Sequence, residues 1–211
     1  MKQLIFLLLL IPTLALARPV SYVGGTTLMV ENDGEKNAAL LHYTVSPNLA
    51  VGYRTEYLRH HNATFNGAQA NWLVKRWNAP NSQANIYVKS ALGYTHGNGD
   101  RSDNIEGFTG LAADWENRRF MVGYENRAWL SGNAARQHLE QDAMIGVAPY
   151  VAEFGALHSW AMLHIKHVPE DEAGDQVQFV PQMRFFQGPY LLEAGYNITN
   201  DTPVLNGIIR F

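Results

Sequence analysis

Histidine and methionine side chains recur at even spacing in one part of the chain. His158, Met162 and His164 are two or four residues apart, so on an extended strand they would share one face. Imidazole and thioether groups suit copper, and passage of a soft metal ion is therefore one hypothesis. Such spacings are common along a strand, and a polar interior accommodates histidine without any ligand. We expect no bound metal and no cofactor.

Nucleophilic catalysis would need a serine, threonine or cysteine with a base in hydrogen-bond reach. His158 and Ser159 are adjacent, so on a strand their side chains point to opposite faces. His42 and Thr44 share a face, but threonine is a poor substitute for a serine nucleophile. The sequence has no cysteine, which rules out disulfides and thiolate chemistry. These patterns predict that the protein is not an enzyme.

The elements that would hold these residues are strands, because apolar side chains fall on every second position. In the segment 49–59, Val51 and Tyr53 lie on one face, while Arg54 and Glu56 lie on the other. The same alternation recurs along most of the chain. About twelve strands are predicted, an even number, at 22–32, 37–46, 49–60, 65–77, 84–95, 105–117, 119–130, 136–150, 157–168, 176–187, 189–198 and 203–211.

The connections between these segments alternate between compact turns and longer loops richer in glycine and charge. Ser46-Pro47-Asn48 and the stretch from Ala152 to Ala156 are among the compact ones. One position breaks the alternation, where Trp77 follows Arg76, and a bulge or a snorkelling arginine is expected there. No linker or repeat interrupts the series, which indicates a single domain.

Two different faces on each strand predict two different surroundings. Charged residues make up only 17% of the chain, whereas soluble domains carry about a quarter. An ion facing lipid at mid-membrane costs roughly 2–4 kcal/mol, so the charged faces should line a lumen. The residues predicted to line it are Arg54, Glu56, Lys75, Lys89, Asp114, Glu125, Arg127, Asp142, His158, His164, Arg184 and Arg210.

The first residues of the chain form a separate segment. Lys2 supplies a positive charge, Leu4 to Leu14 an apolar stretch, and Ala15-Leu16-Ala17 a small-residue cleavage site. This pattern predicts a secretory signal peptide over residues 1–17, cut before Arg18. Residues 18–211 would then form the mature domain.

The last strand carries the strongest resemblance to known proteins. Leu205, Gly207, Ile209 and Phe211 alternate up to a terminal aromatic residue, which resembles the assembly signal of Gram-negative outer-membrane β-barrels. The resemblance is to that class rather than to one family. It implies an all-β, closed antiparallel up-and-down transmembrane barrel located in the outer membrane. It also implies insertion by the barrel-assembly machinery and contact with outer-membrane lipids and lipopolysaccharide.

The function predicted from this class is a narrow porin-like channel for small solutes. A barrel of about twelve strands with paired charges inside should be narrow or occluded. The alternative is a structural or interaction barrel with a closed lumen that acts through its outer loops. A lipid-modifying enzyme is less favoured, because the relevant outer-membrane lipases place histidine and serine two residues apart. The net charge of −3 gives no basic surface for nucleic acid.

Overall fold

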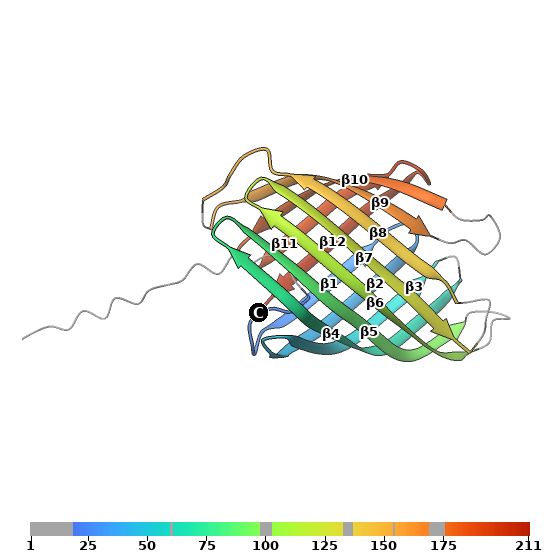
Figure 1. Cartoon of the computed structure of the whole chain (residues 1–211). Coiled ribbons are helices and arrows are strands. Elements are labelled where there is room, and N and C mark those ends of the chain that lie inside the picture. The colour runs from blue at the N-terminus through green and yellow to red at the C-terminus, as the bar shows by residue number, and fades with distance from the viewer. Residues whose placement is uncertain (1–18, 60, 98–102, 133–136, 154, 169–175) are drawn as a thin grey trace, which may run out of the picture.

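A computed structural model describes residues 19–59, 61–97, 103–132, 137–153, 155–168 and 176–211. These residues form one closed barrel of tilted antiparallel strands (Figure 1). The strands are β1 (Thr26–Asn32), β2 (Lys36–Ser46), β3 (Leu49–Leu58), β4 (Ala63–Ala79), β5 (Ser82–Gly97), β6 (Asn104–Asn117), β7 (Phe120–Ser131), β8 (Leu139–Val147), β9 (His158–Val168), β10 (Gln176–Gln187), β11 (Tyr190–Asn197) and β12 (Thr202–Arg210). No helix long and apolar enough to cross a membrane occurs in this part of the chain.

Each strand pairs with its neighbours in the sequence, and β1 closes the sheet by pairing with β12. Leu28 lies opposite Ile209 in this last pair. Just beyond it, Thr26 and Phe211 exchange two backbone hydrogen bonds of 2.8 and 3.0 Å. Closure leaves no strand edge unpaired. The predicted all-β up-and-down barrel of about twelve strands is confirmed.

Strand boundaries agree with the predicted segments to within three residues, except at the start of the first one. The sequence predicts a strand from residue 22, but β1 begins at Thr26. Gly24 has a positive φ of 88°, and the Gly25 amide donates to the Tyr22 carbonyl at 3.0 Å. Tyr22 to Gly25 is therefore a turn, and the residues before it leave the sheet. The predicted signal peptide lies outside the described residues.

The sequence predicts a compact connection between β8 and β9, but β8 ends at Val147 and β9 begins only at His158. Strand β8 stops at Val147, after which the Ala148 amide donates to the Arg119 carbonyl. Pro149 then has no amide hydrogen to continue the ladder. The missing donor explains why the strand ends earlier than its apolar alternation suggests.

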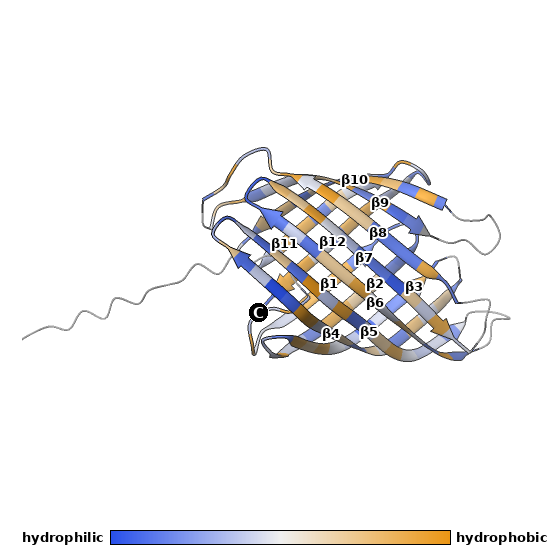
Figure 2. Ribbon diagram, viewed as in Figure 1, coloured by the Kyte–Doolittle hydropathy of each residue, from blue (hydrophilic) through white to orange (hydrophobic). Residues whose placement is uncertain are grey.

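Hydrophilic and hydrophobic residues alternate along the strands (Figure 2), and buried and exposed positions alternate in the same way. In β10, for example, Gln178 and Gln182 are buried, while Val177 and Phe179 are exposed. The exterior is rich in exposed apolar residues, as lipid contact requires. Its exposed residues include Leu41, Val51, Trp72, Leu92, Leu111, Phe120, Ile145, Ile165, Leu192, Leu205, Ile209 and Phe211.

A β-bulge in β4 changes the faces of the residues that follow it. The register with β5 shifts between Leu73 and Lys75, so Val74 is the extra residue. A single inserted residue reverses the facing of every later side chain. Lys75 and Trp77 therefore lie outside, with the Lys75 ammonium 6.0 Å from the Trp77 ring centroid, while Arg76 donates inward to Asn85 at 2.7 Å. The predicted lumenal position of Lys75 is wrong.

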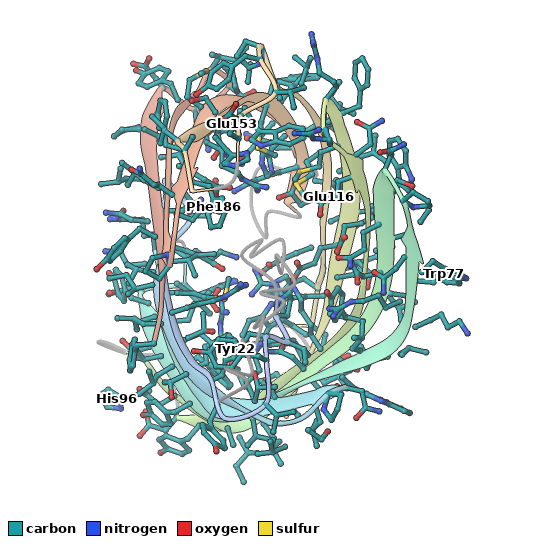
Figure 3. The ribbon with its side chains drawn as sticks, turned by 90° about the vertical axis from the view of Figure 1, so that its left-hand side faces the viewer. Tyr22, Trp77, His96, Glu116, Glu153 and Phe186 are labelled. Atoms are coloured by element: carbon teal, nitrogen blue, oxygen red, sulfur yellow. The ribbon has the colours of Figure 1, made fainter. Side chains whose placement is uncertain are left out.

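The barrel has two distinct ends. The turn end carries Phe211 and the connections at 47–48, 80–81, 118–119, 148–157 and 188–189. The loop end carries the other connections. Figure 3 looks into the barrel from the turn end and shows Trp77 outside the wall, with Glu116 and Phe186 on its inner side.

Candidate functional site: a charged lumen

One cavity of about 660 Å³ lies inside the barrel and is lined by residues of all twelve strands. Its lining includes Glu116 and Met121 near the turn end. It also includes His61 and His138 beside the connections at the loop end. The cavity therefore extends along the barrel rather than forming a pocket on one side.

Six charged residues form a network across this cavity in its loop-end half. We call this network the ion bridge, and its members are Glu31, Lys36, Arg54, Glu56, Arg127 and Glu140. The Arg54 guanidinium lies 2.5 Å from the Glu56 carboxylate and 3.3 Å from that of Glu31. Three carboxylates face three cations, so the ion bridge is formally neutral.

The ion bridge connects strands that lie far apart in the wall. Lys36 on β2 is 3.6 Å from Glu140 on β8, and these strands are six positions apart in the ring of twelve. Arg127 on β7 is 2.6 Å from Glu140 and 3.4 Å from Glu56 on β3. Such contacts narrow the lumen because side chains from opposite walls meet.

Aromatic residues fill the lumen on the β4–β7 side of the ion bridge. This aromatic cluster consists of the rings of Phe65, Phe108 and Trp129, with the Ala91 methyl group packed in the same cluster. The Phe65 and Trp129 rings meet edge to face, with centroids 5.3 Å apart. The guanidinium carbons of Arg54 and Arg127 lie 5.9 and 5.4 Å from the Phe108 centroid, within the range of cation–π attraction.

Further pairs line the wall outside the ion bridge. Lys89 on β5 contacts Glu125 on β7 at 2.5 Å, and Arg184 on β10 contacts Glu193 on β11 at 2.6 Å. The imidazole Nδ1 of His164 lies 2.9 Å from the Asp142 carboxylate. Lys89 and Arg184 each have an acidic partner, so no ring of a single sign forms among these groups.

The turn between β1 and β2 reaches into the lumen at the loop end. Asp33 accepts backbone hydrogen bonds from Glu35 and Lys36, and its other oxygen lies 2.9 Å from Lys166 on β9. Burial of the Asp33 carboxyl opposes its ionisation. The charge of Lys166, together with that of Lys36 and these hydrogen bonds, outweighs burial and lowers the pKa of Asp33 below its usual 3.8. The Asp33–Lys166 pair thus joins the β1–β2 turn to β9, in addition to the contacts of the ion bridge.

The structure places the predicted lumen residues in four different settings. Glu56 is fully buried behind the guanidinium groups of the ion bridge. His158 contacts the Phe186 ring near the turn end, and Arg210 is half-buried on the inner face of β12. Lys75 lies outside. The predicted residues that line the cavity are Arg54, Lys89, Asp114, Glu125, Arg127, Asp142, His164 and Arg184.

Several lumenal residues were missed by the reasoning from sequence. Glu31, Asp33 and Lys36 flank a turn, where charge is usually solvated, so they gave no signal as separate residues. Parity could have found two of them. Lys36 shares a face with the lumenal His42, and Glu31 shares one with the buried Thr27.

The histidine and methionine pattern separates in space. His158 contacts Phe186, whereas Met162 packs in an apolar cluster with Met121, Ala148 and Trp160. Among the described residues, no group of three or more histidine, aspartate or glutamate side chains is arranged to hold a metal ion. Ser159 hydrogen-bonds to the Tyr150 hydroxyl at 3.0 Å, on the face opposite to His158.

Comparisons with known proteins concern the fold. No protein-family model and no curated protein matches the chain. A solved KdgM porin matches with a TM-score of 0.51 and 9% identity, over 89% of this chain and 98% of that one. The same values hold for a KdgM porin in complex with disordered oligogalacturonate. OprD of Pseudomonas aeruginosa matches with a TM-score of 0.46 and 9% identity, over 90% of this chain and 66% of OprD.

These observations together define the class of the protein. The sheet is closed, its exterior is apolar and its interior is charged. The KdgM porin has the same fold over nearly its whole length. The chain is a closed β-barrel with a porin-like fold, and its apolar exterior is suited to a membrane.

Proposed function

We propose that this barrel is a narrow channel that lets small polar solutes cross the outer membrane. The observation that carries the proposal is the cavity, whose lining extends from Glu116 near the turn end to His61 and His138 near the loop end. A lumen lined by charged and amide side chains offers a polar path through an apolar membrane. The porin fold supports the same function.

The charge arrangement predicts weak discrimination between anions and cations. Strong ion selectivity needs a ring of one sign, whereas the ion bridge holds three acids and three bases. Size should decide instead, because the aromatic cluster and the ion bridge occupy part of the same cross-section. The channel should therefore favour small polar solutes over large ones of either charge.

Single-channel recording in planar bilayers tests this function. The wild-type protein should show discrete conductance steps, and N206W should reduce them because Asn206 lines the cavity. L205W is the matched control, since Leu205 is the preceding residue of β12 and is exposed on the exterior. Equal conductance for both variants would contradict a lumenal path, and the absence of any steps would contradict the channel.

A closed structural barrel is the second candidate, and the ion bridge favours it. The contact between Lys36 and Glu140 joins opposite walls across the lumen, and buried ion pairs of this kind can hold the walls in place. Such a barrel would act through its loop end. It predicts no uptake of small sugars by proteoliposomes that hold the folded protein, whereas a channel predicts swelling.

The surroundings of the barrel are part of this proposal. The apolar exterior would contact outer-membrane lipids and, at the loop end, lipopolysaccharide. The C-terminal strand that ends at Phe211 would be recognised by the barrel-assembly machinery. The absence of enzymatic activity stays a prediction, and incubation of the folded protein with phospholipid or lipid A should release no fatty acid.

A further inference from the structure

The residues before β1 fold back into the barrel instead of extending the sheet. The turn from Tyr22 to Gly25 reverses the chain at the turn end, where Tyr22 lies within the ring of strands in Figure 3. Two backbone hydrogen bonds hold this turn on β2. The Gly24 amide donates to the Thr44 carbonyl at 2.9 Å, and the Thr44 amide donates to the Gly25 carbonyl at 3.0 Å.

The side chains on the other side of the turn attach the segment to the inner wall. Ser21 donates its amide to the Thr44 hydroxyl at 3.3 Å, and the two hydroxyl oxygens lie 3.1 Å apart. Val20 is only 1% exposed, although it belongs to no strand. It belongs to one apolar cluster with inward residues of four consecutive strands, namely Ala50, Leu73, Tyr87 and Ala112. Pro19 lines the main cavity.

The inner wall carries small side chains at the level of this segment. Two of the four wall residues in the cluster of Val20 are alanines, Ala50 on β3 and Ala112 on β6. At the loop end of the same strands, inward positions carry the large rings of Phe65 and Phe108. Small wall residues leave space at the turn-end level, and Val20 occupies it as an apolar anchor. The contacts are those of a packed element rather than of a loose chain end.

We propose that residues 19–21 form a constriction that sets the size limit of the channel in its turn-end half. This inference rests on the proposed channel function. Pro19 is part of the cavity lining, so the segment lies beside the cavity. The segment therefore fills part of the lumen that solutes could otherwise pass through. The lumen then has two successive narrow levels, this segment near the turn end and the ion bridge near the loop end.

Cysteine pairs test the position of the segment, and the natural chain contains no cysteine that could interfere. In the full-length exported chain, V20C/A112C should form a disulfide under mild oxidation, seen as a reductant-sensitive shift in gel mobility. V20C/L111C is the matched control and should not form one, because Leu111 points outward. Failure of V20C/A112C to cross-link, or equal cross-linking of both pairs, would overturn the inference.

Conductance tests the role of the segment. Deletion of residues 19–21 should raise the single-channel conductance and the size of the largest poly(ethylene glycol) that enters, while oxidised V20C/A112C should keep wild-type values. If the deletion variant does not reach the folded, heat-modifiable form, P19G/V20G releases the anchor with the chain length unchanged. Wild-type conductance and size limit in a folded released variant would overturn the constriction.

The two proposals fail in different ways. If the wild-type protein is silent but the released variant conducts, the segment closes the lumen, which supports the inference and corrects the view of an open channel. If no variant conducts although V20C/A112C cross-links, the channel function and the size-limiting role both fall. The lumenal position of the segment then stands on the cross-link alone.

Discussion

The ammonium nitrogen of Lys36 lies 3.6 Å from the Glu140 carboxylate, although β2 and β8 are six strands apart in the ring. A contact between opposite walls is possible because both side chains are long and each forms a further ion pair with a neighbouring side chain. Lys36 is also 3.7 Å from Glu56, and Glu140 is 2.6 Å from Arg127. The pair therefore belongs to a network that narrows the lumen without giving it a net charge.

Removing one charge from the ion bridge should create ion selectivity. E140Q leaves the network with an excess positive charge, so the reversal potential in a salt gradient should shift toward anion preference. R127Q leaves an excess negative charge and should shift the reversal potential the opposite way. Shifts of the same sign in both variants would show that the ion bridge does not contact the permeating ions.

Two lysines on neighbouring strands give a sharper test of the lumen. Lys89 lines the cavity beside Glu125, so K89Q should shift the reversal potential toward cation preference. Lys75 lies outside beyond the bulge, so K75Q should leave the reversal potential unchanged. Strict alternation along β4 would instead predict a shifted reversal potential in both variants. Such a result would contradict a bulge between Leu73 and Lys75.

Much of the barrel could be predicted because alternation is a local property. Whether Val51 or Arg54 faces lipid depends on parity within one strand, and the cost of a charge in lipid makes the choice unambiguous. The sequence predicts a bulge at Arg76 and Trp77, but its position at Val74, two residues before Arg76, depends on how β4 pairs with β5. An error of two residues in the position of the bulge is enough to assign Lys75 to the wrong face of β4.

The cross-lumen contacts could not be predicted in the same way. Parity shows that Arg127 and Glu56 both point inward, but not that they meet at 3.4 Å across four strands. That distance depends on the shear and tilt of the closed sheet, to which every strand contributes. Val20 is a similar case, because its burial depends on a turn that the alternation from residue 22 conceals.

The link between Asp33 and Lys166 should make stability depend on pH. Because the pKa of Asp33 in the folded protein lies below 3.8, its stabilising charge is fully present above that pH and is lost as the pH falls through the lowered value. D33N should therefore reduce the free energy of unfolding by on the order of 3 kcal/mol at neutral pH, as for other broken buried pairs. The difference from wild type should vanish in strong acid. Urea unfolding of the refolded barrel at several pH values measures this.

Lys166 provides the control for that measurement. In a K166M background Asp33 has lost its ammonium partner, so the additional effect of D33N at neutral pH should be much smaller. The backbone hydrogen bonds to Asp33 Oδ1 can persist in D33N, because asparagine keeps an acceptor oxygen. An undiminished effect in the K166M background would show that D33N acts through the turn and not through the ion pair.

The terminal residue should matter for assembly more than for the finished barrel. The backbone of Phe211 pairs with Thr26 at the closure of the sheet, while its ring is 65% exposed on the exterior. F211A keeps the backbone pairing, so the purified variant should refold in detergent to the same heat-modifiable form as wild type. In cells its amount in the outer membrane should fall, because an exposed terminal ring is available to the assembly machinery.

F120A, which removes another exposed ring at the turn end, is the control and should assemble normally. Equal losses for F211A and F120A would point to lipid anchoring by aromatic residues in general and against a specific signal at the C terminus.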